Sequence, residues 1–128
     1  MKKYLLIILR LVLAGLLIQT LYFKFGGHPD SVYIFTKIGM EPYGRIGIGI
    51  MELLASILLL IPRTVWAGAV LAVGILAGAI LMHLTLLGIE VQGDGGGLFY
   101  TGILLFVLAL VIAWLYRKDI PVIGTKFK

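Results

Sequence analysis

The chain has 128 residues, which is room for a single small domain over residues 1–128, and its formal net charge is +5. Only 13% of its residues are charged, 61% are hydrophobic, and its mean hydropathy is +1.11. Soluble domains carry about 25% charged residues, so this composition excludes an ordinary soluble protein and indicates an integral membrane protein. The basic residues lie mostly near the chain ends, which gives no indication of nucleic-acid binding. The absence of cysteine excludes disulfides, thiolate nucleophiles and iron–sulfur ligation by this chain itself.

The first apolar run covers residues 4–22 and follows Lys2 and Lys3. A basic start before an apolar centre is also typical of a signal peptide, but no small-x-small cleavage site follows this run. We therefore predict a retained first membrane-spanning helix, in which Arg10 and Gln19 are polar positions.

Residues 23–43 form a connection that is too long for a tight turn between helices. Pro29 suits the start of a short helix and Gly39 suits its end. The apolar residues between them fall roughly on one helical face: Val32, Phe35 and Ile38. We predict a short interfacial helix near Asp30–Ile38, lying at the membrane surface.

Three further apolar runs predict membrane-spanning helices, over residues 44–61, 65–88 and 98–116. The short break at residues 62–64 makes the second and third spans an antiparallel hairpin. Gly74 and Gly78 in the third span allow a close contact between helices inside the bundle. The sequence therefore predicts an all-α membrane protein, a four-transmembrane-helix bundle with a short interfacial helix between helices 1 and 2.

The basic residues also predict the orientation of the bundle. Four spans place both chain ends on the same side of the membrane. Lysines and arginines gather at those ends and at the break between the second and third spans, which by the positive-inside rule makes that side cytoplasmic. They are Lys2, Lys3, Arg63, Arg117, Lys118, Lys126 and Lys128.

Glu52 stands near the middle of the second span, where a carboxylate needs a partner, a proton or a wet cavity. With a helical rise of ~1.5 Å per residue, Glu52 lies roughly 12 Å from the outer boundary, and Gln19 and His83 roughly 6–8 Å. Arg45 lies at the rim on the same helical face as Glu52. Arg10 is nearer the cytoplasmic side, and its long side chain could extend towards Glu52.

Polar residues within membrane spans usually face the bundle interior or a cavity, so their clustering at one depth predicts a polar pocket in the outer half of the bundle. Two loop residues, Lys24 and Asp94, are expected to cap this pocket from outside. Glu52 and His83 are the candidates for proton exchange. The predicted ligand-binding residues are Arg10, Gln19, Lys24, Arg45, Glu52, His83 and Asp94.

Each of these residues also has a purely structural interpretation. Glu52 is equally well explained as an ion-pair partner of Arg10 or Arg45 that fixes the register of the helices. His83 by itself is more often a hydrogen-bonded packing residue than a metal or haem ligand, and its only companion, His28, lies in a loop. One glutamate and one histidine are too few for a di-iron site, so no metal site is predicted.

Several short motifs follow one another in a fixed order along the chain. They are Arg10 and Gln19, Tyr22-Phe23-Lys24-Phe25, Glu41-Pro42-x-Gly44-Arg45, Gly49-x-x-Glu52-Leu53, Gly78-Ala79-x-x-x-His83-Leu84-x-x-Leu87-Gly88 and Asp94-Gly95-Gly96-x-Leu98-Phe99. From about Arg10 to Phe106 this order resembles the DoxX family of small four-helix membrane proteins of bacteria and archaea. The resemblance implies a cytoplasmic (inner) membrane location and a redox-associated role, because the family name derives from a membrane subunit of a terminal quinol oxidase.

Three functions follow as hypotheses. The first is a quinone-linked subunit whose pocket binds a quinone head group, with no intrinsic cofactor and with redox enzyme subunits as partners. The second is a small-solute transporter or lipid-binding module, which would be expected to form a homo-oligomer. The third is a structural assembly subunit of a membrane complex. The lipid bilayer is a partner in all three, and the chain is not expected to be a complete enzyme alone.

Overall fold

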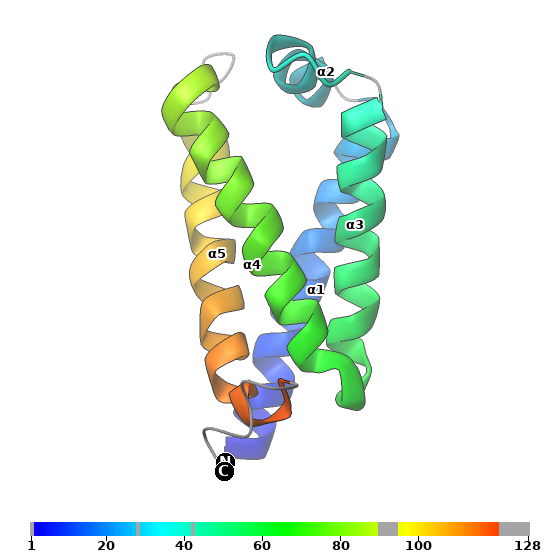
Figure 1. Cartoon of the computed structure of the whole chain (residues 1–128), viewed down its shortest axis with the longest axis vertical. Helices are drawn as coiled ribbons and strands as arrows, with labels where there is room; N and C mark the ends of the chain where they lie inside the picture. Colours follow the sequence, from blue (N-terminus) through cyan, green and yellow to red (C-terminus); the bar gives the residue numbers. More distant parts are fainter. Residues whose placement is uncertain (1, 28, 42, 90–94, 121–128) are drawn as a thin grey trace.

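The computed structural model describes residues 2–27, 29–41, 43–89 and 95–120, and within these residues it contains helices and no strand. The elements are α1 (Lys2–Phe25), α2 (Pro29–Lys37), α3 (Tyr43–Leu60), the 3-10 turn η1 (Pro62–Thr64), α4 (Val65–Met82), the π-helical turn η2 (His83–Leu87), α5 (Gly97–Leu115) and the 3-10 turn η3 (Arg117–Asp119). The four long helices form an antiparallel bundle, and α2 lies across one of its ends (Figure 1). The predicted all-α bundle with a short helix between its first two long helices is confirmed.

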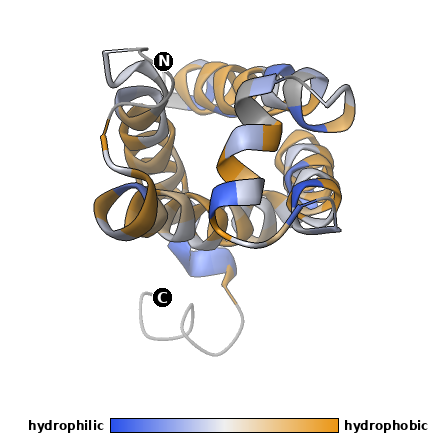
Figure 2. Cartoon of the chain, turned by 90° about the horizontal axis from the view of Figure 1, so that it is seen from above, coloured by the Kyte–Doolittle hydropathy of each residue, from blue (hydrophilic) through white to orange (hydrophobic). Residues whose placement is uncertain are grey.

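The outward faces of the bundle are apolar. Three segments are long and apolar enough to cross a membrane, at Lys3–Tyr22, Tyr43–Leu60 and Pro62–Leu87, and α5 adds a shorter apolar segment, Phe99–Leu115. Large apolar side chains such as Ile8, Ile50 and Leu104 are exposed, and hydrophobic residues occupy much of the long helices seen from the α2 end (Figure 2). Such surfaces suit hydrocarbon and not water, so the chain is a multi-pass membrane protein.

Two helix ends differ from the sequence-based prediction. The first span was expected to end at residue 22, but α1 continues to Phe25 and therefore includes Lys24. The backbone ends this helix through Gly27, which has a φ of 66° and donates from its N–H to the Lys24 carbonyl. The third span was expected as one helix over residues 65–88, but α4 ends at Met82 and the chain continues as a π-helical turn to Leu87.

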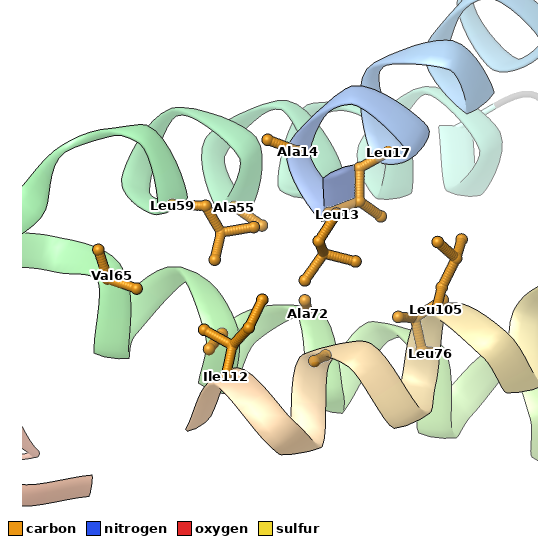
Figure 3. Close-up of a cluster of buried hydrophobic side chains, with 12 residues drawn as sticks. Leu13, Ala14, Leu17, Ala55, Leu59, Val65, Ala72, Leu76, Leu105 and Ile112 are labelled. Carbon is orange, nitrogen blue, oxygen red and sulfur yellow. The ribbon is translucent and has the colours of Figure 1, made fainter. Parts of the chain in front are cut away.

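The dense core lies in the half of the bundle that contains the start of α1, the end of α5 and the α3–α4 turn, which we call the terminal end. All four long helices contribute buried side chains to it (Figure 3). Gly68 of α4 lies close to the α3 backbone, because a Cβ at this position would be 2.8 Å from the Ala55 oxygen and 2.8 Å from the Leu59 nitrogen. The core residues are Leu13, Ala14, Leu17, Ala55, Leu59, Val65, Ala69, Ala72, Leu76, Leu105, Ala109 and Ile112.

The expected close helix contact at Gly74 and Gly78 is wrong for the described part of the chain. A Cβ added at either glycine would meet no atom within 4 Å outside its own helix backbone and chain neighbours. Both glycines are exposed, whereas Gly68, one and a half turns or more before them, is buried. The α3–α4 interface is therefore tight at Gly68 and open at Gly74 and Gly78.

Substituting Gly68 with alanine is expected to destabilise the bundle by about 1–3 kcal/mol, because the new methyl group would overlap backbone atoms of α3. The matched substitution Gly74→Ala puts the same methyl group into open space. It should be neutral or stabilising by about 0.5–1 kcal/mol, since alanine restricts the unfolded chain. Thermal unfolding of both variants in detergent, followed by circular dichroism, measures the difference, and equal midpoints would contradict the tight contact.

Candidate functional site

The interior face of α1 carries two polar residues towards the α2 end of the bundle. Leu13, Leu17 and Leu21 are buried and follow the spacing of one helical face. Thr20 and Lys24 continue this face, at three and seven positions beyond Leu17, which turns both polar side chains towards the other helices.

A buried ion pair joins α1 to α3. Glu52 is only 4% exposed. Its Oε1 lies 2.8 Å from Lys24 Nζ, and its Oε2 accepts a hydrogen bond of 2.5 Å from the Thr20 hydroxyl. A carboxylate in a membrane span requires such compensation, and both of its oxygens receive it here from α1. The partner expected from the sequence was Arg10 or Arg45, so that expectation is corrected to Lys24.

Arg45 holds the end of α1 in place. Its Nε lies 2.9 Å from Glu41 Oε1 and 3.0 Å from Glu41 Oε2, and its Nη1 donates to the backbone carbonyl of Lys24. A cation at the last carbonyls of a helix satisfies them and interacts favourably with the helix dipole. Arg45 therefore positions Lys24 through its backbone, and it is not among the residues that line the cavity described below.

Arg10 does the same for the end of α3. Its Nε donates to the Leu59 carbonyl at 2.8 Å and its Nη2 to the Leu60 carbonyl at 3.1 Å. The side chain thus turns towards the terminal end of the bundle and not towards Glu52. Because α1 and α3 run antiparallel, each carries an arginine that caps the carboxyl end of the other.

Above the dense core, at the α2 end, the four long helices enclose a cavity of about 820 Å³. Most of its wall is apolar, and its polar lining side chains are Thr20 and Lys24 of α1, Glu52 of α3, His83 of η2 and Thr101 of α5. A large apolar cavity with a few convergent polar groups is the usual form of a small-molecule site. Four different elements supply these groups, so the site exists only in the assembled bundle.

His83 begins the π-helical turn and lies against α5. It is 8% exposed, its Nδ1 lies 3.0 Å from the Gly88 carbonyl oxygen, and its ring meets Phe99 edge-on with centroids 5.5 Å apart. A carbonyl oxygen only accepts, so Nδ1 carries the hydrogen, and in the neutral ring Nε2 is the proton acceptor. π-Helical turns are frequent at functional sites, and this one sets the direction of a cavity-lining imidazole.

The remaining predicted residues lie elsewhere. Gln19 is on an exposed face of α1 and does not line the cavity. Asp94 and His28 lie outside the described residues. Within residues 2–27, 29–41, 43–89 and 95–120, no group of three or more His, Cys, Asp or Glu residues is placed to hold a metal ion.

Two polar residues of the cavity wall, Thr20 and Thr101, are not among the residues predicted from the sequence. The sequence did contain a signal for Thr20, since it continues the 3- and 4-residue spacing of Leu13 and Leu17, whereas Gln19 does not. Thr101 is an isolated hydroxyl in the otherwise apolar α5, but the apolar residues around it give no periodicity that shows which way it faces.

The DoxX family model matches residues 5–85, which include most of α1, all of α2 to α4, and Lys24, Glu52 and His83. The chain belongs to the DoxX family. No curated protein and no solved structure was found to match it. In this DoxX family member the matched region supplies most of the cavity wall, and α5 closes the bundle beyond it.

Replacing Lys24 with methionine is expected to destabilise this DoxX protein by about 3–5 kcal/mol, because it leaves the buried Glu52 carboxylate without its cation. The double variant Lys24→Met/Glu52→Gln should recover much of the loss, since no uncompensated charge remains. The midpoint of thermal unfolding in detergent measures each variant. Lys37→Met, at an exposed position on α2, is the matched control, and an equal effect of Lys24→Met and Lys37→Met would contradict the importance of the pair.

Proposed function

We propose that this DoxX family protein is a redox-associated membrane subunit that binds a quinone or a similar polar-headed amphiphile in the cavity at the α2 end. The observation that carries this proposal is the position of the Lys24–Glu52–Thr20 cluster and of His83 on the wall of one large, mostly apolar cavity. A quinone has a head group with two carbonyl oxygens and an apolar tail, so it needs both kinds of surface.

The polar groups suit a quinone head group chemically. Lys24 has three N–H donors, so it can donate to a quinone carbonyl oxygen as well as to Glu52. His83 holds a hydrogen on Nδ1 and leaves Nε2 as a proton acceptor, which suits a hydroxyl of the reduced head group. Glu52 and His83 are thus the candidates for exchanging protons with the ligand, as a residue of each type commonly does in general acid–base chemistry.

The distribution of charge supports an orientation with both termini in the cytoplasm, and membership in the DoxX family supports a bacterial or archaeal cytoplasmic membrane. α1 begins and α5 ends at the same end of the bundle (Figure 1). Arg63 in η1 and Arg117 and Lys118 in η3 are at that same end. Under the positive-inside rule the α2 end, with the cavity, then faces the outer half of the bilayer.

A second candidate function is a lipid-binding or transport module without redox chemistry. The mostly apolar wall of the cavity favours it, because such a wall accepts an acyl chain as readily as a quinone tail. Uptake of a solute into proteoliposomes that contain the purified protein would favour this function over a redox role. The third candidate, a structural subunit, is favoured by the fact that Glu52 already has Lys24 and Thr20 as partners.

The proposed function is tested with a quinone of known chemistry. Wild-type protein in lipid nanodiscs should bind decylubiquinone. Glu52→Gln should weaken binding about tenfold or more, and His83→Gln, which removes a neutral acceptor, about two- to tenfold. A hydrogen bond to a charged group contributes about 1.5–3 kcal/mol, and each 1.4 kcal/mol is a factor of ten. Titration with decylubiquinone, together with native mass spectrometry of co-purifying molecules, gives the affinities.

The matched control is Asp119→Asn, which makes the same kind of carboxyl-to-amide change at an exposed residue of η3, remote from the cavity. It should bind decylubiquinone as the wild type does. Unchanged binding in Glu52→Gln, with a lowered unfolding temperature, would assign the cluster to helix packing and contradict the proposed function.

A further inference from the structure

The interface between α3 and α4 changes from packed to open along its length. At the terminal end Gly68 lies against Ala55 and Leu59 of α3. One to three turns further towards the α2 end, residues of both helices line the cavity. Figure 1 shows the two helices close together near their connecting turn and diverging towards α2.

The residues at this opening are exposed on the outside and line the cavity on the inside. Met51 of α3 is 41% exposed and Val70 of α4 is 46% exposed, and Gly74 and Gly78 of α4 are exposed as well. All four also line the cavity. The cavity therefore communicates with the surroundings of the bundle between the sides of α3 and α4.

Helix α2 crosses the end of the bundle above the cavity (Figures 1 and 2). Ile34 and Phe35 of α2, with Met40 after it, line the cavity at this end. Phe35 is buried, so α2 packs against the bundle through this side chain. At the α2 end the cavity is thus lined by apolar residues, of which Phe35 is buried and Met40 is 40% exposed. The side between α3 and α4 is the one that faces hydrocarbon.

We propose that ligands enter this cavity sideways from the bilayer, through a portal edged by Met51 on α3 and by Gly74 and Gly78 on α4. This deepens the proposed function and rests on it for the identity of the head-group site. The portal restricts the ligand to one class, amphiphiles that dissolve in the membrane and carry an apolar chain. The head group reaches Lys24, Glu52 and His83, and the chain remains in or across the portal.

The two glycines give this portal its width. Neither would meet another atom within 4 Å if it carried a Cβ, so a larger side chain can be placed there without disturbing a helix contact. Leucine at Gly78 would instead extend into the opening. Gly15 on α1 offers a matched control, because it is also helical, exposed and free of neighbours within 4 Å, and it does not line the cavity.

The first experiment measures access to the cavity without any ligand. Tryptophan is placed inside the cavity as Phe35→Trp, and separately as Leu105→Trp, in a chain whose Trp66 and Trp114 are replaced by phenylalanine. Vesicles with brominated phospholipid tails should quench both reporters at least twice as strongly as aqueous iodide does. Adding Gly78→Leu should reduce lipid quenching at least twofold, and adding Gly15→Leu should leave it unchanged. Two reporters are used because either substitution could disturb packing.

The second experiment measures ligand binding. Decylubiquinone, which has an apolar tail, and ubiquinone-0, which has the same head group without that tail, are titrated into protein in nanodiscs. Wild-type protein should bind the tailed quinone at least tenfold more tightly. Gly78→Leu should slow its association about tenfold, and Gly15→Leu should not.

The outcomes separate the two proposals. Quenching by iodide and not by brominated lipid would show access from water and overturn the portal, whether or not quinone binds. Equal effects of Gly78→Leu and Gly15→Leu would overturn it too. Lipid quenching that Gly78→Leu reduces, together with no quinone binding by the wild type, would support the portal while removing the quinone from the proposed function.

Discussion

A carboxylate placed within hydrocarbon must be compensated, and the arrangement of the cavity end of this protein follows from that requirement. Glu52 receives its compensation from Lys24 and Thr20, which both belong to α1. This fixes the register of α1 against α3 at one height. Arg45 and Arg10 fix the same antiparallel pair at its two ends, because each caps the carboxyl end of the opposite helix. Three polar contacts thus hold two apolar helices in a single relative position, which apolar packing in lipid alone specifies less strictly.

Helices α4 and α5 pack against this pair, and their arrangement gives the bundle two different halves. At the terminal end, Gly68 lets α4 approach the α3 backbone, and the buried leucines and alanines close the interior. At the α2 end, α4 diverges and leaves a cavity whose wall holds the polar cluster. The dense half supplies stability, and the open half supplies a space that a tightly packed bundle would not contain. Replacing both members of a buried ion pair with well-packed apolar residues often leaves the stability of a protein unchanged or raises it. Stability alone therefore does not explain why Lys24 and Glu52 line this cavity, and their position favours a role in binding.

Family membership and the cavity restrict function to different degrees. Membership in the DoxX family establishes the kind of membrane protein. The chemistry of the cavity, with donors, one carboxylate and one imidazole above an apolar wall, favours a polar-headed amphiphile as ligand. The open side between α3 and α4 favours supply of that ligand from the membrane. These inferences rest on separate observations, so the head-group site, the quinone and the portal can be tested one by one.

The sequence by itself determined the class of the protein and much of its fold. Its composition indicates a membrane protein, and its apolar runs predict the four long helices. Pro29 and Gly39 predict the short helix between the first two. It also pointed to Glu52 and His83, because isolated polar residues in apolar spans stand out. It did not determine their partners. The sequence predicts a loop at Lys24, because the end of α1 depends on the backbone geometry of two or three residues. It does not separate Lys24 from Arg10 and Arg45 as the partner of Glu52, because chain spacing does not determine which neighbouring carbonyl a long side chain reaches. The difference between Gly68 and the pair Gly74 and Gly78 was equally invisible, since all three are glycines on one apolar helix. Only the angle between α3 and α4, a property of the assembled bundle, makes the first a packing contact and the others the edge of an opening.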